Sequence, residues 1–187
     1  MAANDEKKMI ITRIKIVFVL FLSGMMFPTT GQTGSGISEK NTVLLTLERS
    51  RDADEIRYTA NCTENGRLDT NEPIKVFWVR KTQNNETEPL TWIQKKHAYG
   101  IRITEPYNSV TGNLKFQFVS YPQKTFELRK NGEQGYKVYT IIENSEIEVT
   151  RIFVQMEGEG WVPSISYVKI IGYTAGSNGL VAETIIP

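Results

Sequence analysis

The sequence has very few residues suited to covalent or metal chemistry. Its 187 residues include one cysteine, Cys62, and one histidine, His97. A single cysteine cannot form an internal disulfide, and a structural zinc site needs several cysteine or histidine ligands. The composition therefore excludes a disulfide scaffold and a zinc cluster of that kind, and we expect no metal and no cofactor.

A basic surface is also missing. Lysine and arginine number 22 against 21 acidic residues, and four of the cations (Lys7, Lys8, Arg13 and Lys15) lie in the first fifteen residues. Binding a nucleic-acid backbone requires a cation close to each neutralised phosphate. We therefore expect no nucleic-acid partner.

No apolar run is long enough for a membrane-spanning helix, which needs about 20 residues. The longest, Ile16 to Phe27, follows Arg13 and Lys15 and precedes small residues, which is the layout of a secretory signal. The sequence thus predicts a signal peptide over residues 1–31, a flexible linker over 32–40 and a single domain over 41–187. An uncleaved anchor is the alternative, and Met9 is an alternative start to Met1.

Export without disulfides favours a bacterial periplasm or exterior over an animal secretory route. We therefore expect an exported protein with no membrane association after the signal is cleaved.

Short runs rich in Val, Ile, Thr, Phe and Tyr alternate with turn residues beyond Glu39. This spacing predicts an all-β, mainly antiparallel fold, with a β-sandwich and one short packed helix favoured and a closed β-barrel as the alternative. Three Asn-Gly pairs, at 65–66, 131–132 and 178–179, mark hairpin turns. The predicted strands are 42–48, 55–61, 74–81, 99–104, 114–121, 124–129, 136–142, 146–156, 165–173 and 180–186.

The one predicted helix covers residues 89–97. Pro89 suits its first turn, Gly100 its end, and helical spacing places Leu90, Ile93, Gln94 and His97 on the face expected to dock on the sheet. His97 could act as a general base, but a histidine in the last turn of a helix is also favoured by the carbonyl dipoles, and we favour that structural interpretation. Cys62 and the many glutamates carry no catalytic motif.

The stronger candidates for a site lie at two strands that are apolar on both faces, 76–79 and 151–156. Arg80 ends the first strand and Arg151 opens the second, and a guanidinium beside a buried strand must meet an acid, a carbonyl or an incoming anion. With Trp78, Gln155, Lys95 and Lys96 nearby, these arginines could line a polar pocket for an anionic or sugar-like ligand. The alternative, which we favour, is an internal ion pair with a glutamate.

Four spaced blocks, NEPIKVFWVR, LTWIQKKHAYG, FQFVSY and TRIFVQMEG, resemble a bacterial family known as domain-of-unknown-function 4833, over about residues 52–186. The resemblance implies a single exported domain and brings no catalytic residues. It also singles out the positions that fit the family's pattern: Pro73, Trp78, Arg80, Gln94, Tyr99, Gly100, Arg151 and Gln155.

These observations predict a noncatalytic binding or interaction domain whose partner is a small anionic or sugar-like ligand or another protein. The predicted ligand-binding residues are Arg80, Arg151, Gln155, Trp78, Gln94, Lys96 and Tyr99. A carboxylate-based hydrolase is the second hypothesis, because sugar cleavage needs only two acids at a set separation. A lipid carrier is the third, and it would require a closed barrel with an apolar cavity.

Overall fold

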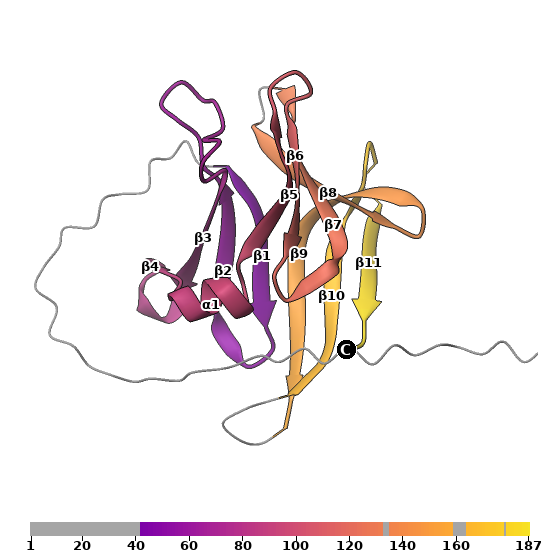
Figure 1. Cartoon of the computed structure of the whole chain (residues 1–187). Helices are drawn as coiled ribbons and strands as arrows, with labels where there is room; N and C mark the ends of the chain where they lie inside the picture. The colour runs from indigo at the N-terminus through magenta and orange to yellow at the C-terminus, as the bar shows by residue number, and fades with distance from the viewer. Residues whose placement is uncertain (1–41, 133–134, 159–163, 178) are drawn as a thin grey trace, which may run out of the picture.

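The computed structural model describes residues 42–132, 135–158, 164–177 and 179–187 (Figure 1). The predicted signal peptide and linker, and Asn178 of the third Asn-Gly pair, lie outside these described residues. Within the described ranges no helix combines the length and apolar character needed to cross a membrane.

The fold is all-β, as predicted, and every predicted strand is present. An additional strand, β4, occupies a segment for which the sequence indicated no strand. The strands are β1 (Val43–Arg49), β2 (Asp52–Ala60), β3 (Ile74–Arg80), β4 (Glu86–Pro89), β5 (Ile101–Asn108), β6 (Asn113–Phe118), β7 (Tyr121–Lys130), β8 (Tyr136–Ile142), β9 (Ser145–Glu157), β10 (Ser164–Thr174) and β11 (Leu180–Ile185), joined by the helices η1 (Lys81–Gln83) and α1 (Trp92–His97).

The long strand β9 connects all parts of the sheet. Its residues 145–149 pair with β8 and its residues 151–154 pair in parallel with β1, while β10 runs antiparallel along β9 and pairs in turn with β11. Two arms therefore extend from β9: an amino-terminal arm, β1 to β4, and a meander arm, β8 to β5.

The sheet curls into an open half-barrel. Among the described strands, β4, β5 and β11 each pair along one edge only, so the sheet does not close on itself. The closed barrel that we kept as an alternative is not favoured. The layers expected of a sandwich are instead parts of one continuous, curled sheet, seen in Figure 1 as the amino-terminal arm on the left and the meander arm at the centre.

The core lies between the inner faces of the two arms. Cross-strand register places Leu47, Ile56 and Trp78 in one row across β1, β2 and β3, because Leu47 pairs with Ile56 and Ile56 pairs with Trp78. The ring of Tyr58 meets the ring of Phe118 edge to face, with the centroids 5.4 Å apart. Burying an aromatic side chain of this size stabilises a fold by about 1.5–3 kcal/mol, so contacts across this interface fix the curl of the sheet.

Helix α1 is shorter than predicted and begins at Trp92. Thr91 caps it: its side chain accepts a hydrogen bond from the backbone N–H of Gln94, and the Gln94 side chain accepts one from the backbone N–H of Thr91. Leu90 is buried, as predicted, but His97 is exposed. The prediction that His97 docks on the sheet was wrong because the helix is less than two turns long and has no second turn to bring that position inward.

Candidate functional site

Four of the predicted site residues come together where α1 meets the amino-terminal arm. Trp78 is 3% exposed, and its Nε1 donates to Oε1 of Gln94 at 3.4 Å. The ring of Tyr99, just after the helix, meets the Trp78 ring edge to face at 5.7 Å, and the Arg80 guanidinium lies 4.7 Å from the Trp78 ring centroid. We call Trp78, Arg80, Gln94 and Tyr99, together with Arg49, the tryptophan cluster.

Arg80 has acidic partners on two neighbouring strands. Its Nη1 lies 3.1 Å from Asp54 of β2, and Nε donates to Glu88 of β4 at 2.8 Å. Desolvation by itself raises the pKa of Asp54, but hydrogen bonds from Arg80 and Thr82 outweigh it and leave that pKa below its usual value. Arg80 thus has the acid pairing that our alternative interpretation of this residue requires.

Arg49 belongs to the same cluster, although the sequence did not single it out. Its guanidinium lies 4.7 Å from the Trp78 ring centroid and donates to the Tyr99 hydroxyl at 2.9 Å. It also pairs with Asp52, while its buried Nε has no hydrogen-bond partner among the described residues. Trp78 therefore carries two guanidinium contacts, and the cluster is closely packed around it.

The other three predicted residues lie elsewhere. On the paired strands β1 and β9, Leu47 is opposite Ile152, and both lie in the row that contains Trp78 on the inner face. Arg151 is opposite Thr46, one position earlier. Because side chains alternate between faces along a strand, Arg151 and Gln155 point to the outer face, opposite the tryptophan cluster. Arg151 is about half exposed, with Glu48 3.6 Å away. Lys96 lies on the exposed side of α1, 5.9 Å from the ring centroid of Trp92.

A polar groove of about 460 Å³ crosses the outer face of the meander arm. Its walls are outward side chains from alternate positions of β6 and β7, such as Lys115 and Gln117 on β6, because the intervening residues, such as Leu114 and Phe116, are buried in the core. We call it the meander groove; its lining residues are Thr104, Glu105, Lys115, Gln117, Thr125, Phe126, Glu127, Arg129, Tyr139, Thr140, Ile141 and Glu146.

The charged groups of the meander groove are ordered by ion pairs within it. Arg129 bridges Glu127 and Glu146 at 2.7 Å each, and its guanidinium lies 4.9 Å from the centroid of the Tyr139 ring. Hydrogen bonding from Arg129 is the main reason that the pKa of Glu127 lies below its usual value, and the two glutamates raise the pKa of Arg129. The other two charged groups of the groove, Lys115 and Glu105, pair with each other at 3.1 Å.

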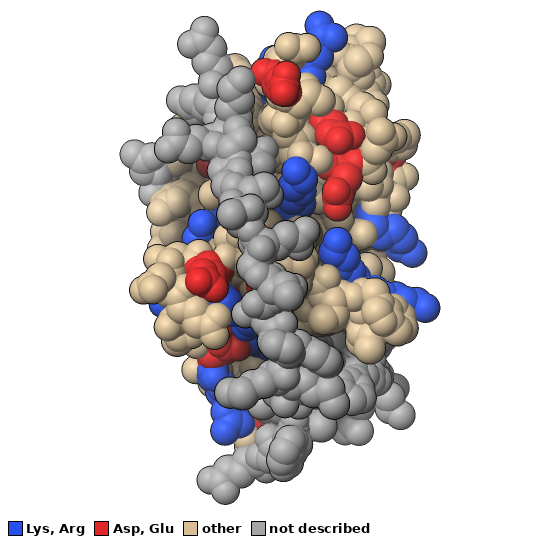
Figure 2. Space-filling view, turned by 90° about the vertical axis from the view of Figure 1, so that its left-hand side faces the viewer, with Lys and Arg blue, Asp and Glu red and all other residues tan. Residues whose placement is uncertain are grey.

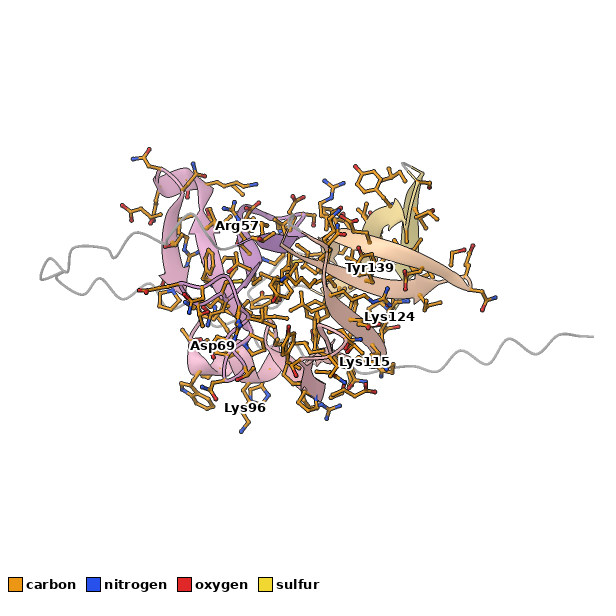
Figure 3. The ribbon with its side chains drawn as sticks, turned by 90° about the horizontal axis from the view of Figure 1, so that it is seen from above. Arg57, Asp69, Lys96, Lys115, Lys124 and Tyr139 are labelled. Atoms are coloured by element: carbon orange, nitrogen blue, oxygen red, sulfur yellow. The ribbon has the colours of Figure 1, made fainter. Side chains whose placement is uncertain are left out.

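The meander groove shares no residue with the tryptophan cluster. In Figure 3, Lys115 and Tyr139 lie with Lys124 on one side of the molecule, away from Arg57 and Lys96. Figure 2, which views a different face, shows basic and acidic side chains interspersed on the described surface, with no continuous basic stripe. The seven residues predicted from sequence therefore do not form the meander groove, and none of them lines it.

Little in the described part of the chain is arranged for metal or thiol chemistry. No group of three or more His, Cys, Asp or Glu side chains in these ranges could hold a metal ion. Desolvation raises the pKa of the Cys62 thiol, which is the direction opposite to that of a reactive thiolate.

Comparison with known proteins places residues 45–183 in one family model, described as a domain of unknown function, DUF4833. Searches of curated proteins and of solved structures find no significant match to the chain.

Proposed function

The chain belongs to the DUF4833 family, and from that premise we propose that it is an exported, noncatalytic binding domain whose meander groove holds a hydroxyl-rich, sugar-like ligand. The observation that carries the proposal is the lining of the groove. Hydroxyl and amide side chains from three neighbouring strands, Thr104, Gln117 and Thr125, stand beside charged donors and acceptors on one face of the sheet. A sugar, which both donates and accepts hydrogen bonds, matches such a surface.

Charge favours a neutral ligand over an anionic one. The two cations of the meander groove, Lys115 and Arg129, face three carboxylates, those of Glu105, Glu127 and Glu146, which gives the lining a net charge of −1. Each cation already pairs with a carboxylate of the groove. An anion would have to displace one of these pairs, whereas a neutral polyol can bond to both members of a pair.

A hydrolase is less well supported at this site. Sugar cleavage by two carboxylates needs one of them protonated at working pH, which requires a raised pKa. The pKa of Glu127 is lowered, and Arg129 stands between Glu127 and Glu146. A lipid carrier is also less well supported, because the half-barrel is open and the apolar cavity beside Phe118 and Ile170 measures only about 50 Å³.

Calorimetric titration with neutral hexasaccharides of glucose, xylose and N-acetylglucosamine tests the proposal. We expect one of them to bind, and Gln117→Ala to weaken that binding at least tenfold through the loss of a direct hydrogen-bonding group, about 1.4 kcal/mol. Gln155→Ala, on β9 and outside the groove lining, is the matched control and should leave affinity unchanged. Absence of binding to every neutral sugar, or tight binding of an acidic polysaccharide alone, would contradict the proposal.

Export has its own measurement. The signal-like segment supports cleavage near Gly31, so the protein recovered from outside the cytoplasm should begin close to Gln32 by mass spectrometry. An intact amino terminus on cytosolic protein would refute the export half of the proposal.

A further inference from the structure

A second surface, unrelated to the meander groove, lies where the two arms leave the half-barrel open. The strands β3 and β5 flank this opening, and α1 crosses part of it in Figure 1. A groove of about 230 Å³ lies there, with Ile74 and Val76 of β3 on one side and Ile101 and Ile103 of β5 on the other. We call it the edge groove.

The backbone of β5 presents to this groove hydrogen-bonding groups that no other described residue uses. The N–H of Val119 donates to the carbonyl of Gly100 at 3.0 Å, so residues 100 and 119 form a hydrogen-bonded pair of the β5–β6 ladder. Pairs in an antiparallel ladder alternate, so the next pair, Ile101 with Phe118, is not hydrogen-bonded, and neither is Ile103 with Phe116. The N–H and C=O groups of Ile101 and Ile103 therefore point away from β6.

The same reasoning applies to β3 across the groove. The N–H of Asn61 donates to the carbonyl of Pro73 at 2.9 Å, which places Ile74 and Val76 in non-hydrogen-bonded pairs with β2. Strand β4 pairs with β3 only from Phe77 to Arg80, so it leaves this stretch uncovered. Both walls of the edge groove thus combine apolar side chains with outward-facing backbone groups.

Two charged side chains of the edge groove also lack an ion-pair partner in the part of the chain that the structure describes. Lys95 and Glu72 both line it, and neither makes an ion pair with any residue in the described ranges. A partner that carries an acid for Lys95 and a base for Glu72 would complement both.

We propose that the edge groove binds an extended peptide segment of a partner protein, which adds to the free edge of β5 as a further strand. An extended backbone is the ligand that supplies donors and acceptors at the spacing of Ile101 and Ile103. Its alternate side chains enter between the four apolar residues of the walls, and a charged residue near each end meets Lys95 and Glu72.

The test uses a capped seven-residue peptide, KTVTVTE, in which two valines alternate with threonines between a lysine and a glutamate. A peptide of the same composition, KVVTTTE, lacks the alternation and is the control. We expect the first to bind at least tenfold more tightly in fluorescence anisotropy, and to slow hydrogen exchange at the amides of Ile101 and Ile103 at least tenfold.

Two variants make the test specific to the edge. Ile103→Pro removes an N–H that points away from β6, so it should weaken binding at least tenfold while the β5–β6 ladder survives. Lys95→Glu, which touches no ladder, should weaken binding severalfold, whereas Lys96→Glu, its exposed neighbour outside the edge groove, should not. Equal binding of the two peptides, protection of β11 amides instead, or unchanged binding by both Ile103→Pro and Lys95→Glu would overturn the proposal.

Discussion

Replacing Tyr58 by phenylalanine removes one hydroxyl from the point where the two arms meet. Tyr58 is 1% exposed, and its hydroxyl donates to the backbone carbonyl of Tyr99 at 2.7 Å. This bond ties β2 to the segment between α1 and β5. The ring itself, with its edge-to-face contact to Phe118, is retained in the variant.

Two effects set the size of the loss. A hydrogen bond of this kind contributes about 0.5–1.5 kcal/mol net, and leaving a buried carbonyl without its partner costs about 1–3 kcal/mol. These overlap, so we expect Tyr58→Phe to lower the free energy of unfolding by about 1–3 kcal/mol. For a domain of this size that corresponds to a fall in Tm of about 4 °C per kcal/mol.

Urea unfolding followed by tryptophan fluorescence and far-ultraviolet circular dichroism measures the loss. Tyr173→Phe is the matched control, because Tyr173 is 43% exposed and its hydroxyl should contribute little. Tyr58→Ala, which also removes the ring, should cost about 3–5 kcal/mol. A loss below about 0.5 kcal/mol for Tyr58→Phe would show that the bond does not hold the arms together.

Three further predictions concern pH and packing. The pKa of Glu127 is lowered, mainly by Arg129. Its contribution to stability is therefore present above the usual glutamate pKa and is lost as the pH falls through the pKa of the folded state. Arg129→Met should make the free energy of unfolding fall less steeply as the pH is lowered. Desolvation, with a smaller effect of Tyr107, raises the pKa of Tyr136 to about 12. The contribution of this shift to stability is therefore fully present below the usual tyrosine pKa and is lost as the pH rises toward 12. Tyr136→Phe should reduce the loss of unfolding free energy at alkaline pH in the same titration. Gly100→Ala would place a Cβ 1.8 Å from the carbonyl oxygen of Lys95, and should lower the free energy of unfolding by about 1–3 kcal/mol in urea, with an unchanged value contradicting the steric argument.

Local pattern was enough to predict most strands, because alternation and turn residues are local properties. Asn131-Gly132 joins β7 to β8 as predicted, with Gly132 at a φ of +52°. The turn between β8 and β9 places Glu143 and Asn144 at positive φ without a glycine, so it carried a weaker signal. Strand β4 was missed because its sequence, ETEP, has low strand propensity, and pairing with β3 stabilises it there.

The pairing of strands that are distant in the chain could not be predicted from the sequence, and this limited the prediction of the site. The structure brings Trp78 and Arg80 together with Gln94 and Tyr99, whereas Arg151, expected near them, lies on the other face. The parallel register of β1 with β9 decides that outcome, and no local pattern encodes it. Arg49 did carry a signal: it follows Leu45 and Leu47 at spacing two, which places it on the apolar face of its strand.

Part of the lining of the meander groove could be predicted from the sequence. The outward positions of β6 and β7, such as Lys115, Gln117 and Glu127, follow from the alternation in the predicted meander. What the alternation could not supply was the curl of the sheet, which depends on packing between the arms and turns a row of polar side chains into a groove.

The parallel contact between β1 and β9 joins segments about a hundred residues apart. Closing so long a loop costs chain entropy before any contact offsets that cost, so such pairing is intrinsically slow. In a nascent chain emerging from the ribosome, the edge of β1 opposite β2 would lack its partner until the segment after Ser145 has been synthesised. The two arms could thus be joined only late in translation.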